Sequence, residues 1–425
     1  MAVQVKFVRG NTKQQKNRLV IKFGGTSLSC AEKIAKAVQS VKREVRKGTQ
    51  VAVVVSAMGK TTDDLLESVS AAPVRSRSSE HVDDILSMGE RTSARIFHAA
   101  LSAHGVRSRF FDPHDADWPI LTDDRFGDAT PDLLACQRLI QRCIKPCMND
   151  GIVPVLPGFV GKTSDGKITT MGRGGSDITA FLLARCLPAA ESILVTDTIG
   201  LMSADPKLVK GARPISQITV RELIGLADSG TKFLKTKALQ YLNNTFRVRI
   251  TSNVTDSIRA SGTIITGAFP LMLIAELDGN SPSAMVTITG ENISQDPKIM
   301  RDLLGRLAHE KAKIIGFSAA FNALIVYVVW HNRQRLADKI HESVLDHPKA
   351  TAMAVRDNLA LIKVVGVGLV QTPGLVAQVS EPLRENKLNI YGILTVASSI
   401  MIVVDWKEKE KALRLVRNSL RMVAR

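Results

Sequence analysis

The chain has 425 residues, which is too long for one compact core and suits two or three domains of ordinary size. Hydrophobic residues make up 45% of it and charged residues 23%, so the sequence is globular rather than disordered or fibrous. Aromatic residues make up only 4%, which argues against a stacking surface for single-stranded nucleic acid.

The charge distribution narrows the class of protein further. The formal net charge is +17, and a cationic chain suits nucleic acid, a membrane surface or a polyanionic substrate such as a nucleotide. Residues 1–17 form a basic arm without acidic neighbours, which we interpret as a solvated tail, with an organelle-targeting segment as the weaker alternative. No run of about 18 apolar residues occurs, so we expect no membrane span.

The five cysteines fit a reducing cytoplasm. Cys143 and Cys147 lie one helical turn apart, but no histidine or second cysteine pair accompanies them. We therefore favour buried packing over metal binding at these two thiols.

The first 267 residues are predicted to alternate strands with helices. Strands are expected at 18–23, 51–55, 106–111, 152–156 and 192–196, in a hairpin of 159–163 with 167–171, and near Val248 and Ile264. Helices are expected at 31–47, 83–103 and 177–187, in a segment entered through Thr130 and Pro131, and in two stretches between 219 and 243. Apolar strands that alternate with helices indicate a mostly parallel sheet covered on both faces. Residues 18–267 are therefore predicted to form a three-layer α/β domain.

After residue 270 the sequence predicts two small α+β units of the ferredoxin-like type, 271–355 and 356–425. The first has strands at 284–289, 313–317 and 323–330 and helices at 297–309 and 333–344. The second has strands at 361–365, 390–396 and 400–405, a helix opened by Thr372-Pro373-Gly374, and a helix at 407–423. The second unit lacks a last strand, whereas 271–277 is a spare apolar strand. We hypothesise that this spare strand completes the sheet of the second unit.

The first strand ends in a motif suited to phosphate, Lys22-Phe23-Gly24-Gly25-Thr26-Ser27. Two glycines let the backbone approach phosphate oxygens, and free amides there form an anion cradle. Lys22 adds a full positive charge where a transferring phosphoryl group would develop negative charge. Walker-type spacing is absent, so this is not a P-loop, and by itself the motif would also fit a plain tight turn.

A second glycine-rich loop, Gly172-Arg173-Gly174-Gly175-Ser176-Asp177, lies directly before a helix. Arg173 offers the planar fork that binds a carboxylate in two places. Asp177 can hold an ammonium group or order a lysine. A flexible hairpin exit capped by Asp177 is the alternative interpretation.

Other predicted strand ends also carry small, hydroxylated or charged residues. Ser56 to Thr62 follow one apolar strand, and Thr196-Asp197 end another, with Asp205-Pro206-Lys207 soon after. Such ends meet at the ligand edge of an open sheet, where they suit phosphoryl transfer by positioning and electrostatics. Glu90 lies within a helix after Gly89, a setting that by itself is usually a solvated face.

Together these motifs closely resemble the aspartate kinases of the amino acid kinase superfamily. The resemblance extends to Gly89-Glu90-Arg91, Thr169 to Asp177, Ala204-Asp205-Pro206 and Val365-Gly366-Val367-Gly368, so it covers nearly the whole chain. The tail is similar to a tandem pair of ACT domains, which in that family bind amino-acid effectors and build dimer contacts.

The resemblance implies that ATP, with Mg²⁺, phosphorylates L-aspartate to 4-phospho-L-aspartate, the first step toward lysine, threonine and methionine. It implies a lysine or threonine effector, a homodimer or higher homo-oligomer, and no nucleic-acid or membrane partner. It implies that the transferring phosphate is held by Lys22, Phe23, Gly24 and Gly25, and that Lys22 and Asp177 are catalytic. It implies that aspartate is bound by Ser56, Thr62, Glu90, Arg173 and Ser176. It implies that the nucleotide is bound by Thr196, Asp197, Met202, Lys207 and Lys232.

This chain departs from the family pattern at several positions. Met202 stands where the family usually has tyrosine, and Lys207 stands where it has arginine. The family's Gly-Ala-Lys-Val-Leu-His-Pro is here Gly230-Thr231-Lys232-Phe233-Leu234-Lys235-Thr236, and the first ACT unit offers Gln295-Asp296-Pro297 in place of a Pro-Gly helix start. Two alternatives remain: a kinase of the same fold with another acceptor such as glutamate or acetylglutamate, and a regulatory or nucleic-acid-binding relative without activity.

Overall fold

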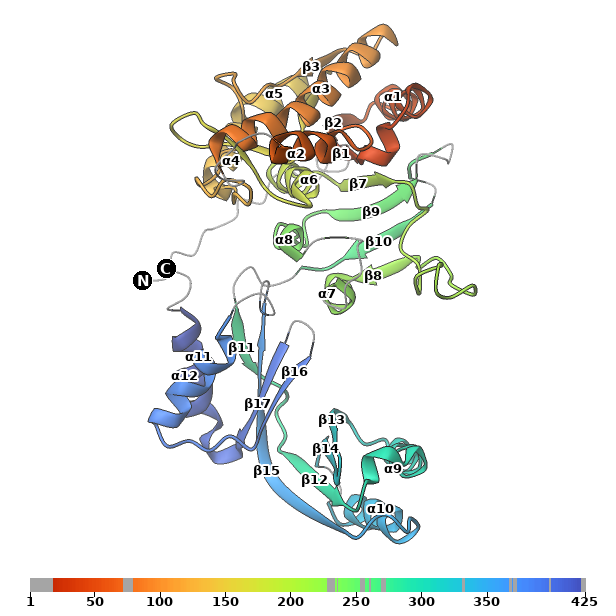
Figure 1. Cartoon of the computed structure of the whole chain (residues 1–425), viewed down its shortest axis with the longest axis vertical. Coiled ribbons are helices and arrows are strands. Elements are labelled where there is room, and N and C mark those ends of the chain that lie inside the picture. The colour runs from red at the N-terminus through yellow and green to blue at the C-terminus, as the bar shows by residue number, and fades with distance from the viewer. Residues whose placement is uncertain are drawn as a thin grey trace. The chain divides into compact units, whose positions relative to one another are not determined.

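The computed structural model of the protein comprises two compact units, Met1–Phe269 and Pro270–Arg425 (Figure 1). It describes residues 18–71, 79–227, 234, 236–252, 257–259, 261–268, 273–330, 333–366, 369, 373–396 and 399–421. Within these residues, no helix has the length and apolar character needed to cross a bilayer.

The first unit is built on an eight-stranded sheet with the order β3-β4-β2-β1-β7-β9-β10-β8 (Figure 1). Its strands are β1 (Arg18–Phe23), β2 (Gln50–Val55), β3 (Ser108–Phe110), β4 (Val153–Pro157), β7 (Glu191–Thr196), β8 (Gln217–Thr219), β9 (Arg247–Ser252) and β10 (Thr263–Thr266). Neighbouring strands are parallel except β9 and β10, which are antiparallel. A separate antiparallel hairpin joins β5 (Val160–Lys162) to β6 (Ile168–Thr170).

Helices cover both faces of this sheet. On one face, α1 (Ala31–Arg46) and α3 (Glu80–Ala103) share a buried cluster with Leu19, Ile21 and Phe23 of β1. The opposite side of β1 faces α6 (Gly175–Cys186), since Lys22 on that side forms an ion pair with Asp177 of α6. The remaining helices of the unit are α2 (Thr61–Ala71), α4 (Leu133–Leu139), a π-helical turn (Ile140–Ile144), α5 (Lys145–Asn149), α7 (Val220–Ala227) and α8 (Thr236–Leu239). Because both faces are covered, strand β2 is apolar along nearly its whole length.

The predicted three-layer, mostly parallel α/β class is confirmed, and a few local predictions are wrong. The helix expected behind Thr130 and Pro131 begins later. Its cap is Asp132, whose side chain accepts hydrogen bonds from the backbone N–H groups of Leu134 and Ala135 at 2.9 and 3.0 Å. Helix α2 and strand β8 were not predicted.

The second unit has one seven-stranded antiparallel sheet in which β13-β14-β12-β15-β17-β16 are neighbours in that order and β11 also pairs with β15 (Figure 1). Its strands are β11 (Ile274–Leu277), β12 (Ser283–Thr289), β13 (Ile314–Ala320), β14 (Ala323–Val329), β15 (Ala352–Val365), β16 (Gly392–Val396) and β17 (Ser399–Asp405). Its helices are α9 (Pro297–His309), α10 (Arg333–Leu345), α11 (Leu375–Glu385) and α12 (Lys409–Arg421). One core joins α9 and α10 to β12 and β14, and a second joins α11 and α12 to β11, β15 and β17.

Strand β15 links the two halves of this sheet. Its first part pairs with β12, from Ala352 opposite Thr289 to Leu359 opposite Ser283, and its second part pairs with β11 and β17. The pairing of β11 with β15 is the one that the spare-strand hypothesis requires. The sequence predicts only 361–365 as strand because residues 352–358 are largely exposed, so their side chains carry no core pattern. The proposed boundary between residues 355 and 356 lies inside β15, and the two unit limits stay predictions.

Candidate active site

The candidate functional residues of the first unit follow the ends of its parallel strands. Phe23 pairs in register with Val55 on one side and Val195 on the other, and Val55 pairs with Pro157. The segments that follow these residues therefore leave the sheet at the same edge, which is where open α/β sheets bind ligands.

Close backbone contacts fix the loop after β1 against its neighbours. The N–H of Gly24 donates to the carbonyl of Val195, and the N–H of Gly59 donates to the carbonyl of Gly25, both at 3.0 Å. A Cβ on Gly25 would lie 2.5 Å from the carbonyl oxygen of Ala57. Gly25 is thus required for the two loops to approach, which is a physical reason for the second glycine of the motif.

Lys22 and Asp177 form the ionic centre of this edge. The Nζ of Lys22 lies 2.7 Å from Oδ1 of Asp177, and each side chain is only 13% exposed. Asp177 is in the first turn of α6, which begins after Gly174 at φ +88°. A cation beside a helix N-terminus is a favourable place for phosphate oxygens.

Arg173 lies in the loop that leads into α6. Its side chain is exposed and makes no hydrogen bond or ion pair with any residue that the structure describes. Only three residues lie between it and Asp177, so both belong to one short segment. Ser176 is buried and abuts Gly158 after β4, where a Cβ on the glycine would lie 2.6 Å from that of the serine.

Glu90 of α3 is buried beside the loop after β2. It is 4% exposed, and burial raises the pKa of its carboxyl to about 7, although the nearby N–H of Ala57 and hydroxyl of Thr62 act to lower it. Its Oε2 has no hydrogen-bond partner among the described residues. The hydroxyl of Thr61 instead donates to the carbonyl of Met58 at 2.7 Å. Of the two threonines, Thr62 is therefore the one directed at Glu90.

The residues assigned to the nucleotide follow β7. The hydroxyl of Thr196 lies 3.1 Å from the carbonyl of Thr198, and Asp197 is exposed beside it. Met202 is half-buried and Lys207 is exposed. Lys232 lies outside the described residues.

The side chains of Phe23 and Ser56, two of the predicted site residues, differ in how accessible they are. Phe23 is 0% exposed and its ring lies 5.3 Å from that of Phe97, so only its main chain is available to a nucleotide. Ser56 donates its N–H to the carbonyl of Phe23 at 3.0 Å, which places its half-buried side chain beside the loop after β1.

Sequence reasoning missed two residues at this edge. Phe159 has φ +68°, a left-handed conformation that is rare for an aromatic residue, and it packs against Gly175 at the start of α6. Asp83 is completely buried in α3 and binds the backbone before the Arg173 loop. The spacing of Asp83 from Glu90, seven residues on one helix, is the signal that could have revealed it.

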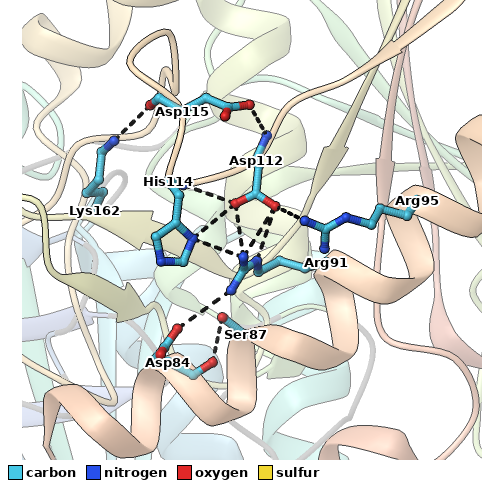
Figure 2. Close-up of polar contacts among 8 residues, drawn as sticks. All are labelled: Asp84, Ser87, Arg91, Arg95, Asp112, His114, Asp115 and Lys162. Carbon is cyan, nitrogen blue, oxygen red and sulfur yellow. Dashed lines mark hydrogen bonds and ion pairs between the residues drawn. The ribbon is translucent and has the colours of Figure 1, made fainter.

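Arg91, although next to Glu90, serves a different purpose (Figure 2). Its guanidinium donates to the carboxylate of Asp112 at 3.1 Å and lies 2.9 Å from Nδ1 of His114, while Arg95 pairs with the same carboxylate. The guanidinium groups of two arginines bind this buried carboxylate and hold the segment after β3 onto α3. This cluster is a support for the helix that carries Glu90.

Comparison with known proteins identifies the family. A model described as "Amino acid kinase family" matches residues 17–252, more than half of the chain, and an ACT domain model matches residues 354–418. The chain belongs to the amino acid kinase family. The expected aspartokinase-like enzyme with a C-terminal ACT region is confirmed.

The relatives agree along the whole length. The chain is 30% identical to "Aspartokinase" of Thermus thermophilus, with 95% of this chain and 98% of the relative covered. It is 30% identical to "Aspartokinase" of Geobacillus stearothermophilus, with 92% and 93% covered. Its fold is similar to that of a solved aspartate kinase from Synechocystis, with a TM-score of 0.76, 24% identity, and 95% of this chain and 69% of that one covered. It is also similar to E. coli aspartokinase III solved with aspartate and ADP, with a TM-score of 0.54, 24% identity, and 95% and 99% covered.

The raised pKa of Glu90 predicts a pH dependence of stability. Between the ordinary value of 4.5 and about 7, the folded protein keeps a proton that the unfolded chain releases. The free energy of unfolding should therefore fall as pH rises through this window. Glu90→Gln should remove that fall, measured by denaturant unfolding at several pH values, whereas Glu67→Gln on the exposed side of α2 should keep it. Parallel profiles for wild type and Glu90→Gln would contradict the assignment.

Proposed function

We propose that this kinase transfers the γ-phosphoryl group of ATP to the side-chain carboxylate of L-aspartate, giving ADP and 4-phospho-L-aspartate. The observation that carries the proposal is the pairing of Lys22 with Asp177 at 2.7 Å, four residues after the uncommitted guanidinium of Arg173. The short loop and helix start that carry Arg173, a cation for a carboxylate, thus also carry the aspartate that pairs with Lys22, a cation for a phosphate.

The charges of the reactants explain why such an arrangement is needed. A carboxylate oxygen of aspartate attacks the γ-phosphorus as the bond to the β–γ bridging oxygen breaks, and ADP leaves with the bond's electron pair. The nucleophile is already ionised, so the reaction needs no general base; it needs two anions held in line. Lys22 and the amides after Gly24 would neutralise charge on the transferring group.

Recognition of the amino acid would use the remaining groups. Arg173 would bind the α-carboxylate with two parallel hydrogen bonds. Glu90 and Asp177 would face the ammonium group, whose charge favours the ionised form of Glu90. Ser56, Thr62 and Ser176 would line the acceptor site.

The nucleotide would lie along the segment after β7, with Thr196, Asp197, Met202, Lys207 and Lys232 as its contacts. ATP would bring Mg²⁺, which binds mainly through substrate phosphates and water and needs only one or two carboxylates. The residues present fit this role, because Asp197 is exposed at the end of β7 and offers one carboxylate. Mg²⁺ would supply charge neutralisation on the phosphates.

The relatives support this acceptor. Those at 30% identity are named aspartokinases, and the similar E. coli enzyme was solved with aspartate and ADP. A coupled assay of ADP release should show turnover with L-aspartate and little with glutamate, acetylglutamate or carbamate. Turnover with one of the latter alone would place the chain with another acceptor. No turnover combined with tight, salt-sensitive DNA binding would favour the nucleic-acid-binding alternative.

Arg173→Ala should raise KM for aspartate far more than KM for ATP. The lost bidentate contact is worth about 1.5–3 kcal/mol, or roughly a 10- to 150-fold change in KM. Arg142→Ala, at an exposed arginine outside the edge, is the control. If Arg173→Ala weakens ATP alone, Arg173 belongs to the nucleotide site.

We also propose that the ACT region binds an amino-acid effector, lysine or threonine, and contributes to a homodimer or larger homo-oligomer. The region around 368–375 and the strand near 393–399 are the expected effector segments; residues 367, 368, 370–372, 397 and 398 lie outside the described part of the chain. E. coli aspartokinase III, which this fold resembles with a TM-score of 0.53 and 23% identity over 95% of this chain, was solved with lysine. A cytoplasmic location stays a prediction.

Titrating lysine, threonine and methionine separately into the aspartate assay should show inhibition by lysine or threonine. A chain that ends after residue 269 should lose this inhibition if it retains activity. Unchanged inhibition of the shortened chain would refute an effector site in the ACT region.

A further inference from the structure

We infer that Asp83 is a positioning residue for the amino-acid acceptor, because it anchors the backbone from which the Arg173 loop starts. This inference rests on the proposed function and deepens it. Asp83 itself is too deeply buried to touch a reactant, so it would act through Arg173.

The contacts of Asp83 are unusual for a carboxylate. It is 0% exposed, and no lysine, arginine or histidine among the described residues forms an ion pair with it. Its Oδ2 accepts from the backbone N–H groups of Thr170 at 2.7 Å and Gly127 at 2.9 Å, and its Oδ1 accepts from the hydroxyl of Thr170 at 2.9 Å. Burial of an unpaired carboxylate is costly, and here three donors offset the cost.

Thr170 is the residue at which the Arg173 loop begins. It is the last residue of β6, and Arg173 follows three residues later, after Gly172 at φ +70°. Because Asp83 holds both the amide and the hydroxyl of Thr170, the strand end cannot slide or rotate without breaking two hydrogen bonds. Displacing an anchor of this kind by about 1 Å can cost as much as 100-fold in rate.

A second segment, residues 127–129, clamps the other side of the same strand end. The N–H of Ala129 donates to the carbonyl of Thr170 at 2.9 Å, and a Cβ on Gly172 would lie 3.0 Å from Oδ1 of Asp128. Asp83 reaches this segment through Gly127. One carboxylate therefore ties the helix, the hairpin and the 127–129 segment together.

Lys237 of α8 also binds the 127–129 segment. Its Nζ lies 2.6 Å from Oδ1 of Asp128 and donates to the carbonyls of Asp128 and Ala129 at 2.9 and 3.1 Å. Lys237 is on α8, five residues after Lys232, which we assign to ATP. The 127–129 segment thus lies between α8 and the loop expected to bind the acceptor.

The position of Asp83 on α3 fixes its distance from Glu90 along the helix. Asp83 and Glu90 are seven residues apart, which is two helical turns on one face, or about 10 Å along the axis. The same rigid helix therefore fixes the loop for the α-carboxylate at one point and carries the group for the ammonium at another. Asp83 would set the distance between the two halves of the acceptor site.

The test compares Asp83→Asn with Asp84→Asn. Asparagine keeps the shape of Asp83 but removes its charge; its carbonyl oxygen can accept from the two N–H groups, but its NH2 group must then donate to the Thr170 hydroxyl, so one bond is reversed and the charge-assisted anchor is weakened. Asp84 is the adjacent acid, 53% exposed, with an ion pair to Arg91 at 3.6 Å. Asp83→Asn should raise KM for aspartate about 10- to 100-fold and leave KM for ATP within about twofold, while Asp84→Asn changes neither.

A second pair of variants protects the test against misfolding. Thr170→Val removes only the hydroxyl that binds Asp83, and Thr170→Ser restores it. Thr170→Val should raise KM for aspartate, and Thr170→Ser should return it to near the wild-type value. Equal increases for aspartate and ATP, or no change in folded Asp83→Asn and Thr170→Val, would overturn the inference.

Hydrogen exchange separates this inference from the proposed function. In the full-length protein without substrates, Asp83→Asn should speed amide exchange across residues 170–177, and Asp84→Asn should not. If the wild type is inactive with aspartate but the two variants still differ in exchange in this way, only the proposed acceptor is overturned. Unchanged exchange in Asp83→Asn would overturn the anchoring role whatever the acceptor.

Discussion

The in-register parallel pairing of β1 with β2 and β7 is the constraint on which the site depends. Phe23 lies opposite both Val55 and Val195, so three chain segments leave the sheet side by side. Parallel strands bring their carboxyl ends to one edge, whereas an antiparallel neighbour would carry its end to the other. A register shift of one residue would also exchange the faces of β1, moving Lys22 away from Asp177 and into the core shared with α1 and α3.

Around that edge, the protein holds charged groups at three different depths. Lys22 and Asp177 are nearly buried and pair at 2.7 Å. Among the residues that the structure describes, exposed Arg173 has no partner and buried Glu90 has one oxygen without a hydrogen bond. The paired groups are held in place in the absence of substrate, and the unpaired ones gain most from an incoming carboxylate or ammonium. This division would suit the proposed reaction of two anionic reactants, with preorganised charge for the phosphate and unused charge for the acceptor.

The second unit shows a different principle, since a single long strand joins two similar halves. β15 pairs with β12 along its first part and with β11 and β17 along its second, so both halves share one sheet. Asn358 is left-handed, at φ +55°, and the pairing register with β12 shifts between Ser283 and Met285. A bulge of this kind changes which face a strand presents, so β15 can serve two helix layers formed by distant parts of the sequence.

The sequence by itself determined the class of each unit and the family, because strand and helix periods, glycine positions and charged strand ends are local patterns that survive without knowledge of contacts. It also predicted that Lys22, Arg173 and Asp177 belong to one candidate site at the strand ends. Only the tertiary structure decided which of Thr61 and Thr62 faces Glu90, that the side chain of Phe23 is in the core, and that Asp83 anchors Thr170. The exposed half of β15 escaped prediction for the same reason as Asp83: its state depends on hydrogen-bond partners tens of residues away. Burial and pairing are properties of the folded chain, and they turn an ordinary helical aspartate into an anchor.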